Sequence, residues 1–187
     1  MAVNWQKYTR PGNQDLVRLY QDGLKRLNEK LAKMYQAGVL PEGEILAALK
    51  EEVTTLVAQR QIILKENLKR AAQDSYHDVL HIAARLVNIP VQLTTFSDAD
   101  AAAASRMRPR GVPSFQTLLR KHKQESIEKA PLRAADNLKG ATTLKEVKAA
   151  IKATLTADVN SIMRFHNAEA TMMVNNAAEM AFQAMAD

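Results

Sequence analysis

Apolar residues recur at helical spacing through residues 42–88, a stretch that contains no proline. Positions three and four residues apart share one face of an α-helix, so the pattern predicts a single long helix. At about 1.5 Å per residue that helix would run roughly 70 Å, which exceeds the width of a compact domain of this size. The face is predicted to comprise Ile45, Leu49, Val53, Leu56, Arg60, Ile63, Leu64, Leu68, Ala71, Ser75, Val79, Ile82 and Leu86.

The N-terminal part of the chain predicts an arm followed by a helical hairpin. Residues 1–12 end in Pro11-Gly12, a dipeptide typical of turns, and are expected either to fold back onto the helices or to dock on a partner. An apolar stripe over residues 14–36 predicts the first helix. A glycine and a proline then indicate a helix end, and the short gap makes the next helix an antiparallel neighbour. Residues 13–88 are therefore expected to form a hairpin.

Helical spacing is lost over residues 89–112, where prolines, an alanine run and polar residues replace it. Loops of this length in small domains are usually functional or disordered. Within the stretch, Val91–Phe96 is a candidate short strand and Asp100–Arg106 a candidate helical turn. We expect a long, irregular and basic linker.

Residues 113–187 are predicted to form C-terminal helices that pack on the first part of the chain. One helix is expected to end before Pro131. The last helix opens with Thr143 and Glu146, whose side chains can satisfy the first free amides reciprocally in a capping box. Its later part is rich in alanine and methionine, which suits either packing along the long helix or a surface for another protein.

The predicted fold class is all-α, an elongated helical bundle with a long central helix, an N-terminal αα-hairpin and a long irregular linker. Hydrophobic residues make up 47% of the chain, enough for a core, whereas aromatic residues make up only 5%, which favours helix over sheet. The part of the long helix that the first helix is too short to cover must be buried by the C-terminal helix or by another chain. No apolar run approaches the ~18 residues of a membrane span, so none is expected.

The net charge of +6 is concentrated in residues 89–140, which hold nine Lys/Arg and five Asp/Glu. No carboxylate occurs between Ala101 and Gln124, and the basic residues there are the candidate nucleic-acid-binding residues: Arg106, Arg108, Arg110, Arg120, Lys121 and Lys123. In the run RMRPRG, a proline and a glycine disfavour a helix, so an extended strip of guanidinium groups is predicted to bind phosphates. Such contacts give salt-sensitive affinity without base specificity. The alternative is a solvated loop whose arginines pair with acidic groups of the long helix.

Asp74, His77, Asp78 and His81 lie at spacings of three and four residues, and therefore on one face of the long helix. Two imidazoles flanked by carboxylates can supply half of a metal site, but the other ligands would have to come from elsewhere. The alternative is a solvated polar face with a His–Asp contact. The chain has no cysteine, no Gly-rich phosphate loop and no Gly-x-Ser-x-Gly motif. We therefore expect no enzyme activity and no cofactor.

Residues 140–182 resemble the helical region of the phage Mu F-like minor head proteins, also called head-morphogenesis proteins. In that family a capped helix leads into a stretch with an Arg, a Thr-Glu pair and an Asn among alanines. The corresponding residues here are Arg164, Glu169 and Asn175 or Asn176. Ala168 stands where the family has the Thr, and Asn167 stands where an adjacent Arg is usual.

The resemblance implies a few-copy protein of a virus head, near the portal, that touches the packaged genome and is located in the virion or the host cytoplasm. The expected function is a non-enzymatic phage virion or head-assembly protein that binds nucleic-acid backbone and a protein partner or a second copy of itself. The alternative is a small helical regulator or inhibitor that binds a host protein or a nucleoprotein complex. Salt-sensitive, sequence-indifferent DNA binding favours the first, and a tight complex with one host protein without DNA binding favours the second.

Overall fold

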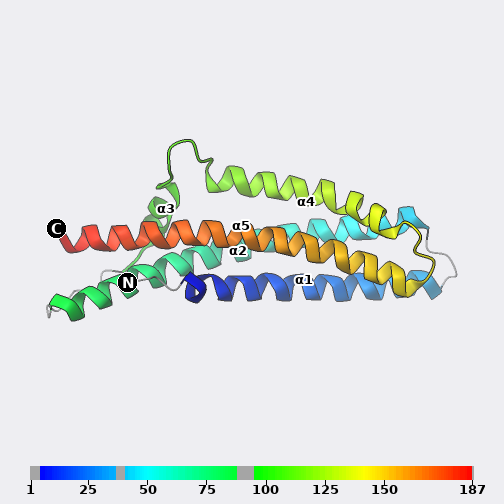
Figure 1. Ribbon diagram of the computed structural model, residues 1–187, viewed down its shortest axis with the longest axis horizontal. Helices are drawn as coiled ribbons and strands as arrows, with labels where there is room; N and C mark the ends of the chain where they lie inside the picture. Colours follow the sequence, from blue (N-terminus) through cyan, green and yellow to red (C-terminus); the bar gives the residue numbers. More distant parts are fainter. Residues whose placement is uncertain (1–4, 37–40, 88–94, 187) are drawn as a thin grey trace. The chain divides into compact units, whose positions relative to one another are not determined.

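The structure, a computed structural model, describes residues 5–36, 41–87 and 95–186. Those residues form five helices (Figure 1) and no strand. The helices are α1 (Trp5–Gln36), α2 (Glu42–Val87), α3 (Asp98–Arg106), α4 (Phe115–Leu138) and α5 (Leu144–Ala186). The predicted all-α class is confirmed, and α2 is one continuous helix, as the sequence pattern predicts.

The chain divides into two compact units. Unit 1 comprises Met1–Asn13, Leu64–Leu118 and Phe165–Asp187, whereas unit 2 comprises Gln14–Ile63 and Leu119–Arg164. Each of the four longer helices therefore contributes residues to both units. This division differs from the consecutive segments expected from the sequence, because helices that pack side by side bring distant segments of the chain together.

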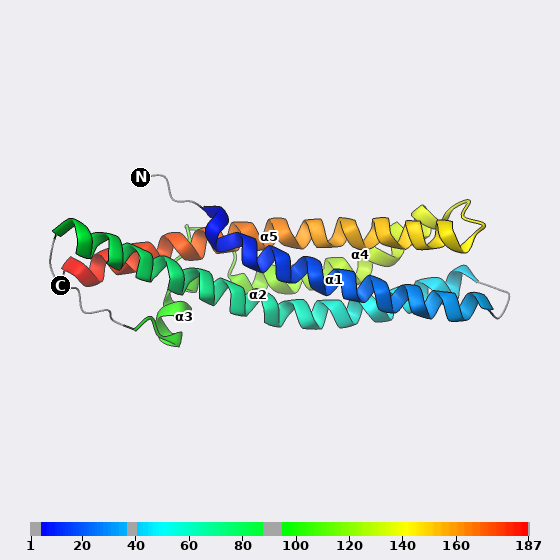
Figure 2. The same ribbon diagram turned by 90° about the horizontal axis from the view of Figure 1, so that it is seen from below.

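Unit 2 combines segments of α1, α2, α4 and α5. In it α1 and α2 lie side by side and run in opposite directions (Figures 1 and 2). Arg26 Nη2 lies 2.6 Å from Glu52 Oε1, and Lys30 Nζ lies 2.5 Å from Glu51 Oε2, so rising numbers in α1 meet falling numbers in α2. The predicted hairpin is confirmed, although residues 37–40 lie outside the described part of the chain. Its buried core includes Leu16, Leu27, Leu31, Leu49, Leu56, Ile151, Leu155 and Ile162.

Unit 1 is built on the second halves of α2 and α5. Its core cluster consists of Leu68, Ala72, Tyr76, Leu80, Phe96, Ala104, Ala170, Met173, Ala177 and Ala181. The alanines of α5 leave little side chain between the helices and so permit close packing of this helix on its neighbours. The C-terminal helix thus supplies cover for the second half of α2, one of the two sources expected from the sequence. Ile82 and Leu86, near the end of α2, are exceptions and remain 44% and 78% exposed.

Pro11 lies inside α1, so the prediction that the first segment ends in a turn at Pro11-Gly12 is wrong. A proline inside a helix forfeits one backbone hydrogen bond, and side-chain contacts hold the first turns in place here. The Tyr8 hydroxyl donates to Asp78 at 2.5 Å. Gly12 packs so closely on His166 that a Cβ at residue 12 would lie 2.4 Å from the imidazole Nε2. Gly12 therefore permits a close helix approach.

The predicted end of a helix before Pro131 is also wrong, because α4 continues through this proline to Leu138. Ala130 and Ala134 are buried on either side of Pro131, and Leu138 is buried one turn further on. Packing along this face offsets the lost hydrogen bond. After the helix, Gly140 adopts a φ of +84°, a left-handed conformation that favours glycine.

The start of α5 agrees with its predicted capping box. The Glu146 amide donates to Thr143 Oγ1 at 3.3 Å, and the Thr143 amide donates to Glu146 Oε2 at 2.9 Å. Thr142 adds a second backbone amide to the same carboxylate, at 2.8 Å. Hydrogen bonds from these two amides hold the pKa of Glu146 below its usual value.

Candidate nucleic-acid interface

Five of the six cations predicted to bind nucleic acid have exposed side chains: Arg106, Arg110, Arg120, Lys121 and Lys123. Arg106 ends α3 and Arg110 follows it, both in unit 1, whereas the other three lie on α4 in unit 2. In the part of the chain that the structure describes, none of the five forms an ion pair with an acidic side chain. Their charges therefore face solvent.

Arg108 is the exception, because its side chain is engaged in contacts inside unit 1. Its guanidinium forms a two-pronged pair with the Glu169 carboxylate of α5, and both side chains are only 7% exposed. Nη1 also donates to the Pro113 carbonyl at 2.9 Å, and Nε donates to the Ser105 carbonyl at 3.3 Å. A side chain with these contacts is occupied inside unit 1. The alternative that an arginine of the linker pairs with an acidic group holds for Arg108, although the acid belongs to α5.

Asn176 holds the same segment of chain from a second point on α5. Its Nδ2 donates to the carbonyl oxygens of Ala104 at 2.7 Å and Met107 at 2.6 Å. Carbonyls at the end of a helix have no partner within the helix, so the Asn176 amide caps the C-terminus of α3. Glu169 and Asn176 are seven residues apart, two helical turns, and so share one face of α5. In the sequence, Glu169 and Asn176 were noted only for the resemblance to a family. Two polar residues on an apolar helix face nevertheless indicate buried polar contacts.

The helix α3 replaces much of the irregular linker expected over residues 89–112. It begins with a capping box in which the Asp100 amide donates to Ser97 Oγ at 3.2 Å and the Ser97 amide donates to Asp100 Oδ2 at 2.7 Å. Hydrogen bonds from the Ser97 hydroxyl and amide lower the pKa of Asp100. The Ser-x-x-Asp spacing was available in the sequence as a signal of this helix start. Residues 91–94 of the candidate strand lie outside the described residues.

The basic part of α4 continues into the most cationic portion of unit 2. Residues 119–164 hold ten Lys/Arg and five Asp/Glu, and one of these carboxylates, Asp158, is neutralised internally by Arg60 of α2. Along α4 a shallow groove of about 420 Å³ is lined by Arg120, Lys123, Gln124, Ile127 and Glu128. Two cations at one end of an open groove suit an extended anionic chain better than an enclosed small molecule.

Two residues of the candidate metal cluster, His77 and Asp78, have other contacts. The Asp78 carboxylate accepts from Lys7 Nζ and from the Tyr8 hydroxyl, both at 2.5 Å. Burial tends to raise the pKa of Asp78, but these two hydrogen bonds outweigh it and lower the pKa. His77 lies with its ring 6.0 Å from that of Tyr76. Among the described residues, no group of three or more His, Asp or Glu side chains is arranged to hold a metal ion.

A buried polar cluster in unit 2 was not predicted as a site. Arg60, 1% exposed, donates through Nη1 to Asp158 at 3.0 Å and to the Tyr20 hydroxyl at 2.7 Å. Its Nη2 donates to Ser126 Oγ at 2.9 Å and to the His122 carbonyl at 3.0 Å. Burial, with the adjoining Asp158 carboxylate, raises the pKa of Tyr20. The signal in the sequence was an arginine on a largely apolar helix face. The cluster joins all four helical segments of unit 2.

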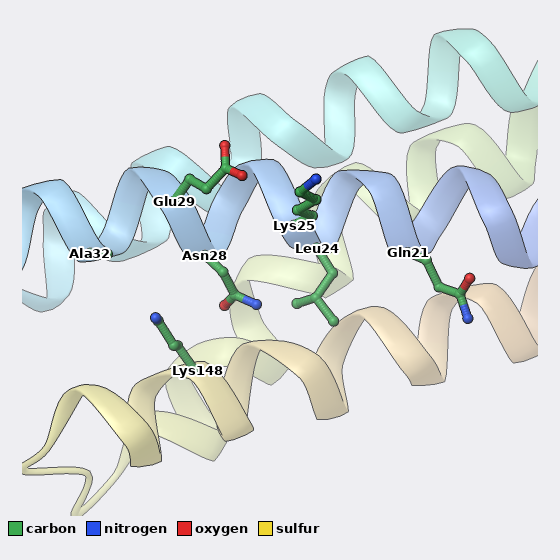
Figure 3. Close-up of a pocket in the computed structure, with 7 residues that line it drawn as sticks. All are labelled: Gln21, Leu24, Lys25, Asn28, Glu29, Ala32 and Lys148. Carbon is green, nitrogen blue, oxygen red and sulfur yellow. The ribbon is translucent and has the colours of Figure 1, made fainter.

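A second groove of unit 2 lies between α1 and α5 (Figure 3) and has a volume of about 370 Å³. Its lining residues are Gln21, Leu24, Lys25, Asn28, Glu29, Ala32 and Lys148. The side chains of Asn28 and Lys148 extend from the two helices into the space between them. Asn28 Oδ1 is buried and has no hydrogen-bond partner in the described part of the chain.

Comparison with protein-family models, curated proteins and solved structures found no match to this chain. The resemblance of residues 140–182 to phage head proteins therefore stays a prediction. Each helix in the described residues lacks the long apolar stretch that crossing a membrane requires.

Proposed function

We propose that this chain is a non-enzymatic phage virion or head-assembly protein, associated with the portal or the genome, that binds nucleic-acid backbone and a protein partner. The observation that carries the nucleic-acid part is the set of five exposed cations within residues 106–123, a stretch without a carboxylate. A phosphodiester chain supplies regularly spaced anions that such side chains bind without reading bases. The resemblance of the C-terminal segment supplies the virion part.

The five cations have no ion-pair partner among the described residues, which favours phosphate binding over the case of a cation that is already paired. In Lys7, Arg26 and Lys30, a side-chain nitrogen lies within 2.6 Å of a carboxylate oxygen. A cation already paired with a carboxylate must lose that partner before it binds phosphate, which reduces the net gain. Unpaired cations release counterions from nucleic acid without this cost, so their contribution to affinity is larger and depends on salt.

Exposed apolar residues support the second part of the proposal, a protein partner. Ile82 and Leu86 of α2 and Phe182 of α5 are 44%, 78% and 60% exposed. All three belong to unit 1, in which the C-terminal ends of α2 and α5 lie at the same end (Figures 1 and 2). Large exposed apolar side chains on neighbouring helix ends are typical of protein contacts. The same observation favours the alternative function, a small helical regulator that binds a host protein.

The test compares two variants with the same change in charge. One replaces Arg120, Lys121 and Lys123 by Gln. The matched control replaces Arg18, Lys50 and Lys65, which are exposed cations elsewhere on the chain, by Gln. Fluorescence anisotropy with a short duplex DNA of random sequence measures affinity.

We expect the first variant to lose most of its affinity and the control to keep it, because only the first removes phosphate contacts. The slope of log K against log salt concentration is expected to fall in magnitude by up to about 2.7 for three lost contacts. Equal losses in both variants would show that overall charge, and not this surface, governs binding. Absence of DNA binding by the unaltered protein, together with capture of one host protein, would favour the regulator.

A further inference from the structure

The buried position of Arg108 sets it apart from its two exposed neighbours. Arg106 closes α3, and Arg110 lies in a turn in which the Val112 amide donates to the Pro109 carbonyl at 3.1 Å. The third residue of this turn is Gly111, with a φ of +86°, a conformation that turns of type II require there. Arg108 points inward, whereas Arg106 and Arg110 are exposed on either side of it.

Two residues of α5 fix this segment. Glu169 holds the Arg108 guanidinium through two of its nitrogens, and Asn176 holds two backbone carbonyls at the end of α3. The Arg108 guanidinium in turn donates to the Pro113 carbonyl, which closes the loop before α4. The backbone at residues 104 and 107 is therefore bonded to α5 directly, and the backbone at residue 113 is bonded to it through Arg108.

We propose that Arg108, Glu169 and Asn176 are positioning residues that present Arg106 and Arg110 as a prearranged pair for two phosphates of a nucleic-acid backbone. This inference rests on the proposed function, because it specifies how that surface recognises its ligand. A free loop would lose conformational entropy on binding, whereas an anchored segment has lost it during folding. Arg108 thus serves to position its neighbours, which explains why one arginine of the run RMRPRG is buried against a carboxylate.

The choice of variants keeps the net charge constant, so that any change in DNA affinity reflects positioning. Asn176→Ala removes both hydrogen bonds to the end of α3, and alanine favours the helix in which it lies. Arg108→Lys keeps the charge but replaces the planar fork with a point charge that cannot pair through two nitrogens. Asn175→Ala is the matched control, because Asn175 is the exposed neighbour of Asn176. Circular dichroism confirms that helix content is retained.

Trypsin provides a readout that does not depend on DNA. It cleaves after Arg106 and Arg110 when the segment opens, and Pro109 prevents cleavage after residue 108. We expect Asn176→Ala and Arg108→Lys to speed cleavage at these two sites about tenfold or more, because proteolysis follows the population of the open form. The control is expected to be cleaved at the rate of the unaltered protein.

The second readout is affinity for the same short duplex DNA. Both variants are expected to bind about five- to tenfold more weakly with an unchanged salt slope, because the phosphates contacted are the same and only the ordering cost is added. Unchanged cleavage would overturn the anchor. Faster cleavage with unchanged DNA affinity would overturn the positioning role while leaving the proposed function intact. If the unaltered protein binds no DNA, both proposals fail, and the cleavage rates still decide whether the anchor exists.

Discussion

Replacing Asp158 by Ala tests the buried polar cluster of unit 2. Asp158 is 4% exposed and accepts hydrogen bonds from Arg60, Tyr20 and Ser126. Its loss leaves the Arg60 guanidinium, which is 1% exposed, without its counter-charge. Removal of one partner from a buried ion pair costs about 3–5 kcal/mol of unfolding free energy. Because natural proteins are stable by only about 5–15 kcal/mol, this single change removes a large share of the total.

The assay is urea unfolding followed by circular dichroism at neutral pH. The slope of the unfolding free energy against urea concentration should be unchanged if only stability differs between the proteins. In a thermal scan, the same loss corresponds to a melting temperature lower by about 6–20 °C for a chain of this size. The matched control is Asp136→Ala, which breaks an exposed ion pair with Lys139. The Asp136 side chain is 72% exposed and that of Lys139 is 77% exposed. That pair is screened by solvent, so no measurable change is expected.

A double variant separates the cost of a stranded charge from the cost of lost packing. Arg60→Met combined with Asp158→Leu leaves no buried charge, and is expected to recover much of the stability that Asp158→Ala loses. If Asp158→Ala destabilises no more than Asp136→Ala, the buried pair is not the internal contact described above. A double variant as unstable as the single one would show that packing, and not the unpaired charge, causes the loss.

Two further predictions concern a close helix contact and the effect of acid. Gly12→Ala is expected to lower the free energy of unfolding by about 1–3 kcal/mol, because its Cβ would lie 2.4 Å from a ring nitrogen of the buried His166. At Gly43 an added Cβ would meet nothing within 4 Å, so Gly43→Ala is expected to raise the free energy of unfolding by about 0.5–1 kcal/mol. Equal effects at both positions would contradict the close contact between Gly12 and His166. Burial, with the charges of Arg60 and Lys121, holds the pKa of His122 below its ordinary value of 6.5, so the folded state disfavours the protonated ring. Its contribution to stability is complete above pH 6.5 and is lost as the pH falls toward the lower folded pKa; His122→Gln is therefore expected to flatten the decline in urea midpoint between about pH 7 and 5.

Local sequence patterns predicted those helices whose boundaries depend on local interactions. The long helix was expected over residues 42–88 and spans Glu42–Val87, and the capping box of Thr143 and Glu146 starts α5. The proline at residue 11 misled the prediction because its helix is held by contacts with distant residues such as Asp78. Tertiary packing overrides local propensity in such cases, and no local pattern reports it.

The candidate site was predictable as a set of charges and not as a set of contacts. A carboxylate-free basic stretch can be recognised in the sequence, and five of its six cations are exposed. The burial of Arg108 depends on Glu169, 61 residues away, and that of Arg60 depends on Asp158, 98 residues away. Pairings at such separations follow from how the helices pack, so the sequence of either segment alone does not contain them.

The most direct test of the central claim is the salt dependence of DNA binding by the unaltered protein. Its affinity for a short duplex is measured by anisotropy at several sodium chloride concentrations between about 50 and 200 mM, the range over which phosphate contacts are strongly weakened. If the five exposed cations bind phosphates, the slope of log K against log salt concentration lies near −4.5, and exchange of the DNA sequence leaves affinity unchanged. A slope near zero, or no saturable binding at the lowest salt concentration, would contradict the proposal that these cations bind nucleic-acid backbone.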